Sequence, residues 1–189
     1  MYTDEVFFKQ LNVILDQQTD DIWKARDAHT DMLCLVGCMN MIEFMGGVSN
    51  GKLGLKGEVK CRFQAGFDLF SDAWMRGGFS EGCVILDKDV MWDLRNSLVH
   101  QYTPKARKYQ AIIVKGTEHK DIVFSYGEEQ SNGTTDDRLI VSFPIDGLII
   151  ELSDARQKLL NLLKQNKTIR DRANKALSRL PEITVSEFM

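Results

Sequence analysis

The chain has 189 residues, of which 43% are hydrophobic and 27% charged, so it is an ordinary globular sequence long enough for one domain with a full core. Its formal net charge of -3 at pH 7 argues against nucleic-acid binding over the whole surface, so any RNA contact must be a local patch. The first residues lack the basic start of a signal peptide, and the longest apolar stretch, 32–45, is too short and polar to span a bilayer. We therefore expect a single cytoplasmic domain with no membrane partner and with reduced cysteines.

Two helices are predicted at the start of the chain. Residues 4–17 carry an apolar stripe at helical spacing, and Thr3 before acidic residues is a suitable N-terminal cap. A second helix is expected to begin near Thr19 and to run to about Met45. Its methionine-rich end is interpreted as deformable core, with a ligand groove as the alternative.

Two patterns in this region resemble ligand-binding sites. His29, Cys34 and Cys38 would share a helix face and could hold a metal, but no second ligand pair follows, so we favour buried thiols and expect no metal. Residues 46–53 match half of a phosphate-binding loop, but Leu53 stands where that loop needs Ser or Thr. A flexible connection explains the glycines without a ligand. It would run through Gly46, Gly47, Gly51, Gly54 and Gly57.

Two further helices are predicted before a change in composition. Residues 58–76 present aromatic side chains at helical spacing, and Gly77 and Gly78 are expected to end that helix. A turn then leads into a helix over 83–101, which Pro104 ends.

The second half of the chain predicts strands followed by helices. Residues 109–114 and 121–126 are rich in β-branched and aromatic residues and indicate a hairpin, and 139–143 reads as a third strand. Helices are expected over about 146–165 and 168–180. The predicted fold is mainly α, with a small antiparallel β insertion at about 109–143 between the 83–101 helix and the C-terminal helices.

The 83–101 helix concentrates the residues best suited to chemistry. Asn96 and His100 are four apart and therefore lie on one helical face, and Arg95 can swing its guanidinium toward the same patch. A permanent cation, an amide and a titratable imidazole suit a phosphate, because the arginine can clamp the anion while the histidine moves a proton. The competing interpretation is structural, with Arg95 paired to Asp93 or Asp89 and His100 stabilised at the helix end.

Arg95, Asn96 and His100 resemble the Arg-x4-His signature of the HEPN superfamily, compact helical domains of bacterial toxins, phage-defence proteins and RNA-processing factors. Tyr102 extends the match to the Arg-x4-His-x-Tyr form of one toxin branch. The resemblance implies an antiparallel helical bundle, from which the β insertion departs, and metal-independent RNA cleavage without a cofactor. Arg95 would clamp phosphate, His100 would transfer protons, and Asn96 would orient one or the other.

The resemblance also implies partners. The implied cleavage needs two proton transfers, but the motif supplies one histidine. HEPN nucleases meet this need with a homodimer that brings two motif helices into one cleft. Tyr102 could be adenylylated by a separate nucleotidyltransferase antitoxin, or it could simply pack at the helix end.

Two basic clusters could contact RNA. Lys105, Arg107 and Lys108 follow the motif, and we favour phosphate contacts for them. The basic residues of the last helix could track an RNA backbone or form a solvated face. They are Lys164, Lys167, Arg170, Arg172, Lys175 and Arg179. Two other functions stay open: a HEPN-like module that binds RNA, nucleotide or protein without cutting, and a plain helical interaction protein.

Overall fold

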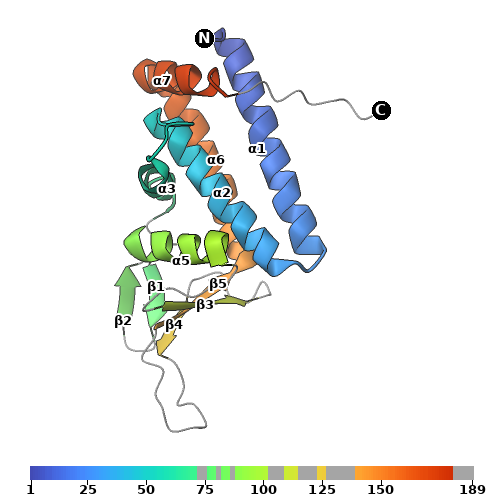
Figure 1. Cartoon of the computed structure of the whole chain (residues 1–189), viewed down its shortest axis with the longest axis vertical. Coiled ribbons are helices and arrows are strands. Elements are labelled where there is room, and N and C mark those ends of the chain that lie inside the picture. The colour runs from blue at the N-terminus through green and yellow to red at the C-terminus, as the bar shows by residue number, and fades with distance from the viewer. Residues whose placement is uncertain are drawn as a thin grey trace.

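The computed structural model describes residues 1–71, 76–79, 82–85, 88–101, 109–114, 123–126 and 139–180. In this part the protein is mainly helical. Three long helices, α1, α2 and α6, run alongside one another, α7 caps one end of them, and α5 crosses near the other end, above a sheet (Figure 1). The mainly α fold class is thereby confirmed.

The first helix is longer than predicted. α1 spans Asp4–Asp27 and α2 spans Asp31–Asn50, so the break that we expected near Thr19 is absent. The Thr19 hydroxyl donates to the Leu15 carbonyl at 2.7 Å inside α1 and does not cap a new helix. The chain turns instead at His29, whose φ of 56° is left-handed. The predicted Thr3 cap is confirmed, because its hydroxyl accepts from the Val6 amide.

Helix α2 forms the centre of the fold. Its buried side chains include Cys38, Met39, Ile42 and Met45. α3, which spans Val59–Phe67, crosses it so closely that a Cβ on Gly46 would lie 1.8 Å from the Arg62 carbonyl oxygen. Gly46 and Gly47 are therefore helical residues at a tight crossing, not parts of a flexible connection, whereas Gly51, Gly54 and Gly57 do lie in the connection with positive φ.

The segment before the motif helix contains strands that the sequence did not predict. α3 ends at Phe67, β1 spans Arg76–Phe79 and β2 spans Gly82–Ile85 as its antiparallel neighbour, and α5 then spans Lys88–Gln101. The helices predicted over 58–76 and 83–101 are thus too long. A short apolar run such as 83–85 fits a helix or a strand by pattern alone, and pairing with β1 decides it.

The later strands are placed correctly by sequence but paired wrongly. β3 spans Tyr109–Val114, β4 spans Val123–Tyr126 and β5 spans Leu139–Pro144. β5 lies between the other two, parallel to β3 and antiparallel to β4, in a sheet of order β2-β1-β4-β5-β3. The predicted hairpin is therefore replaced by a mixed sheet, because sequence patterns report local turns and not which strand occupies the middle.

The C-terminal helices agree with the prediction. α6 spans Ile145–Gln165 and α7 spans Lys167–Leu177, separated by Asn166, whose side chain accepts from the Ile169 amide at 3.1 Å. α7 fastens the start of the chain, because the Asn174 side chain bonds the Tyr2 backbone in both directions, at 2.9 and 2.8 Å. Contacts between residues far apart in sequence therefore close this end of the bundle.

One described helix is long and apolar enough to cross a membrane, namely α2, with a mean hydropathy of 1.5 over its best 18-residue window. This helix is longer than the apolar stretch 32–45 considered from sequence. In the fold, 56% of that window is buried inside the protein, which is typical of a core helix. The cytoplasmic location stays a prediction.

Candidate functional site

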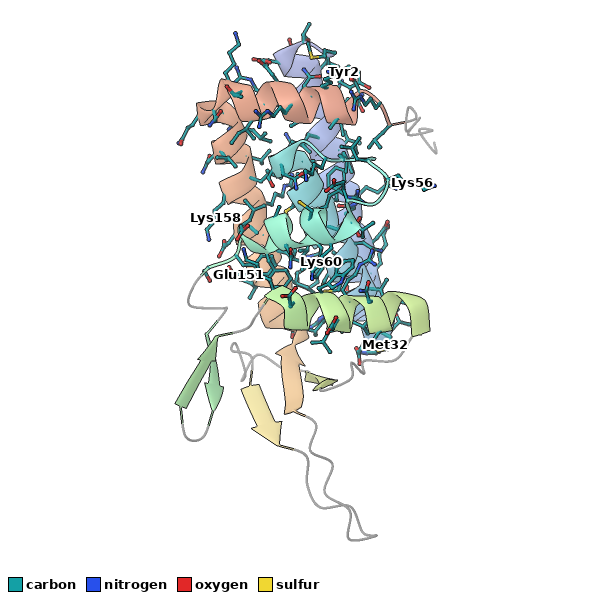
Figure 2. The ribbon with its side chains drawn as sticks, turned by 60° about the vertical axis from the view of Figure 1, so that its left-hand side comes forward. Tyr2, Met32, Lys56, Lys60, Glu151 and Lys158 are labelled. Atoms are coloured by element: carbon teal, nitrogen blue, oxygen red, sulfur yellow. The ribbon has the colours of Figure 1, made fainter. Side chains whose placement is uncertain are left out.

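The motif helix α5 is held on the bundle by its apolar side. Met91, Leu94 and Leu98 are fully buried, as their helical spacing predicted. On the α3 side, Lys60 pairs with Asp89 at 2.6 Å, Gln64 donates to the same carboxylate, and Lys88 pairs with Asp68 (Figure 2 labels Lys60). Each such surface pair stabilises little, but together they fix the orientation of α5 against α3.

Arg95 is buried in an ion-pair cluster that sequence reasoning missed. Its Nη2 donates to Glu43 Oε2 of α2 at 2.6 Å, and Arg62 Nη2 of α3 donates to Glu43 Oε1, also at 2.6 Å. The side chains of Arg95, Arg62 and Glu43 are only 10%, 11% and 16% exposed. Within the described residues, one carboxylate therefore serves two guanidinium groups, so this part of the cluster carries one more positive than negative charge in a largely desolvated place.

The remaining contacts of Arg95 orient it along its own helix. Its guanidinium lies 5.4 Å from the centre of the Trp92 ring, within the range of a cation–π interaction. Its Nη1 donates to Asn96 Oδ1 at 3.4 Å, a long and weak bond. Its Nε has no hydrogen-bond partner in the described part of the chain. The described residues thus hold the guanidinium firmly on the Nη2 side and loosely on the Nη1 side.

The structure brings some predicted site residues together. Arg95 and Asn96 are in contact, and His100 follows Asn96 by one turn of the continuous helix α5, although its side chain lies outside the described residues. Tyr102, Lys105, Arg107 and Lys108 also lie outside the described residues.

The basic residues of the last helix do not join this site. α7 lies at the opposite end of the long helices from α5 (Figure 1). Arg170 is occupied there by Asp4, at 3.2 Å. Any RNA contact by α7 would therefore be separate from the motif.

The missed partner, Glu43, had a signal in the sequence. It is an acid inside an apolar stretch, and a buried acid needs a cation. The pairing considered from sequence is not observed: Asp93 is exposed, and Asp89 bonds Lys60 and Gln64. Local spacing could not find Glu43, because it lies 52 residues before Arg95.

The two ligand-binding patterns considered earlier, the histidine–cysteine set and the glycine-rich segment, have ordinary structural roles among the described residues. His29 is exposed in the turn before α2, whereas Cys34 and Cys38 are buried. A hydrogen bond between the two thiols lowers the pKa of Cys34 and, with burial, raises the pKa of Cys38. Lys52, from the glycine-rich segment, pairs with Glu58 at 2.8 Å, and this contact raises the pKa of Lys52.

Comparison with protein families, with curated proteins and with solved structures finds no match to this chain. The functional argument therefore rests on the residues of α5 and their surroundings.

Proposed function

We propose that the protein is a metal-independent endoribonuclease of HEPN type that serves in a toxin or phage-defence system. The observation that supports this most is the excess of positive charge that the described residues place at Arg95, beside Asn96 and five residues before His100 on the same helix. A fixed cation that needs no reorganisation is what a pentacovalent phosphate requires during cleavage.

The proposed reaction needs no group beyond the protein and water. The 2′-oxygen of a ribose attacks the adjacent phosphorus as its proton is removed, and the bond from phosphorus to the 5′-oxygen breaks as that oxygen gains a proton. The products are a 2′,3′-cyclic phosphate and a free 5′-hydroxyl. His100 would transfer protons, since an imidazole titrates near neutral pH, and Arg95 would stabilise the negative charge.

The contacts of Arg95 suggest where the phosphate would bind. Nη2 is committed to Glu43, whereas within the described residues the one bond of Nη1 is the 3.4 Å bond to Asn96. A phosphate oxygen could replace that weak bond by accepting a hydrogen bond from Nη1, which would leave the amide of Asn96 to hold the phosphate or His100. Glu43 would then keep the guanidinium in place throughout.

The proposal includes a homodimer, because one motif histidine must be joined by a second for two proton transfers. A symmetric dimer meets this need with one patch per subunit. Light scattering of the purified protein is expected to give twice the chain mass of 21.6 kDa. A mass equal to one chain at the concentration where RNA is cleaved would contradict the composite site. Modification of Tyr102 by a separate nucleotidyltransferase stays a prediction.

The alternative is a non-catalytic HEPN-like module that binds RNA, nucleotide or protein. The observation that favours it is the burial of Arg95, which is 8% exposed and already paired, as a purely structural arginine would be. This module would bind its partner through the surface of α5 without breaking a bond.

Substrates that differ only at the 2′-position test the proposed chemistry. We expect the protein to cut a labelled RNA in EDTA and to leave an otherwise identical 2′-deoxy strand intact, because the attacking oxygen is missing. The RNA fragments should end in cyclic phosphates, which mass spectrometry identifies. Cleavage of both strands, or fragments with 5′-phosphates, would rule out the mechanism, and binding without cleavage would favour the non-catalytic module.

A further inference from the structure

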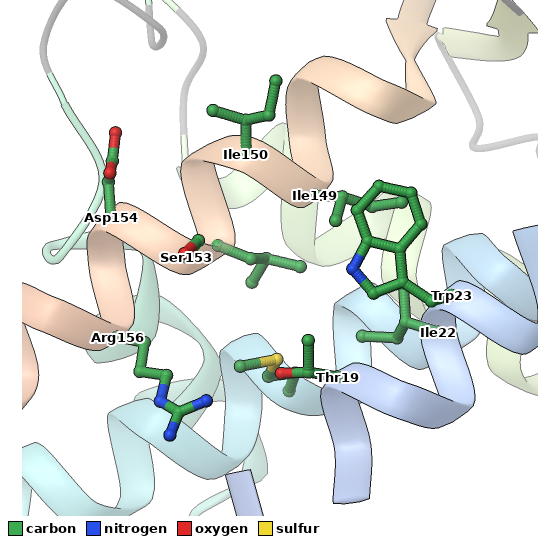
Figure 3. Close-up of a pocket in the computed structure, with 10 residues that line it drawn as sticks. Thr19, Ile22, Trp23, Ile149, Ile150, Ser153, Asp154 and Arg156 are labelled. Atoms are coloured by element: carbon green, nitrogen blue, oxygen red, sulfur yellow. The ribbon is translucent and has the colours of Figure 1, made fainter. Parts of the chain in front are cut away.

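A cavity of about 290 Å³ lies between α1, α2 and α6, and its residues are distinct from those of the α5 site (Figure 3). It is lined mainly by apolar side chains, among them Ile22, Met41, Ile149 and Leu152. Trp23 and Ile150 also line it, and they are 40% and 56% exposed. Large apolar side chains that face water around a cavity are typical of a binding site.

Ion pairs cross from one long helix to the other at both ends of this cavity. Arg156 of α6 pairs with Asp16 of α1 at 2.7 Å, and Arg26 of α1 pairs with Asp146 of α6 at 2.9 Å. Asp16 and Arg26 are ten residues apart on α1, which corresponds to about 15 Å of helix. A partner helix bound along the groove would collide with both of these ion pairs. The space between them therefore suits a compact molecule.

The charges around the cavity select against an anion. Arg156, which lines the cavity, already faces the carboxylate of Asp16, and Asp154 adds an acid with no ion pair in the described part of the chain. The polar residues of the lining are Thr19, Ser153, Asp154 and Arg156, and the other lining side chains are mainly apolar.

We propose that this cavity binds a compact, neutral, predominantly apolar molecule. The molecule packs between Ile22 of α1 and Ile149 of α6, over Met41. This binding site is independent of the proposed nuclease activity, because the site residues of α5 take no part in it.

A matched pair of fluorescent probes tests the charge and the shape. N-phenyl-1-naphthylamine is neutral, and 8-anilinonaphthalene-1-sulfonate has the same rings with an added sulfonate. We expect saturable binding of the neutral probe at one per chain, and at least tenfold weaker binding of the sulfonate. Equal affinity for the two probes, or no saturable binding of the neutral one, would overturn the proposal.

Two variants of α6 locate the bound probe. Ser153 lines the cavity and is exposed, so Ser153→Phe fills the space without opening the core, and it should weaken binding of the neutral probe at least tenfold. Asn161→Phe adds the same ring to an exposed position of α6 that does not line the cavity, and it should leave binding unchanged. Circular dichroism confirms that both variants fold. Undiminished binding by Ser153→Phe would place the probe elsewhere and contradict the proposal.

Discussion

Replacing Glu43 with alanine is expected to destabilise the protein by about 3–5 kcal/mol, the usual cost of removing one partner from a buried ion pair. The reason is the position of Glu43 between Arg62 and Arg95, each bonded to it at 2.6 Å. Without the carboxylate, two guanidinium groups would face each other in a largely desolvated space. Urea unfolding followed by circular dichroism measures the change in the free energy of unfolding.

A second ion pair supplies the control for Glu43. Glu58→Ala also removes a carboxylate bonded to a cation, Lys52, at 2.8 Å, but both side chains there are more than a third exposed. Water can solvate the remaining lysine, so the loss should be much smaller than for Glu43→Ala. Equal losses in the two variants would show that the cluster around Arg95 is not effectively buried.

Gly46→Ala is expected to cost about 3 kcal/mol or more, because overpacking a tight contact forces the backbone apart. The new Cβ would lie 1.8 Å from the Arg62 carbonyl oxygen and 2.3 Å from the Gly66 nitrogen, and neither backbone atom can move without shifting α3. Gly66→Ala meets the Ile42 carbonyl oxygen at 1.9 Å and should cost a similar amount. Thermal and urea unfolding measure both.

The double variant Gly46→Ala, Gly66→Ala identifies the cause of this loss of stability. Both substitutions separate the same pair of helices, α2 and α3, so together they should cost less than the sum of the two. Gly57→Ala is the control: its φ of 81° strains any side chain, but no atom lies within 4 Å of the added Cβ, so about 1–2 kcal/mol is expected. Additive losses, or a loss no larger than that of Gly57→Ala, would contradict the close approach.

Local patterns in the sequence predicted what depends on local chemistry. The buried stripe of α5, the Thr3 cap and the bounds of α6 follow from apolar spacing and capping residues, and all agree with the structure. The continuation of α1 through Thr19 could not be predicted, since a threonine can cap a helix or bond back within one. The position of β5 between β3 and β4 depends on contacts between distant strands.

The same limit applies to the candidate site. The sequence placed Arg95, Asn96 and His100 on one helix because their spacing is local. It did not reveal that Glu43 and Arg62 hold the arginine, because these residues come from two other helices. The site is therefore better described as a motif helix supported by an ion-pair cluster than as an isolated motif.

The cleavage rate of a labelled, mixed-sequence RNA in EDTA, measured with wild-type protein beside His100→Ala, tests the central claim most directly. EDTA removes the divalent ions that many contaminating nucleases need, whereas the proposed mechanism uses none. We expect the wild type to cleave and His100→Ala to lose about 10²–10⁴-fold in rate, the usual contribution of a general acid or base. Asp93→Ala, which changes an exposed residue of the same helix, should still cleave. Equal rates for wild type and His100→Ala, or no cleavage by either, would contradict the assignment of α5 as a nuclease site.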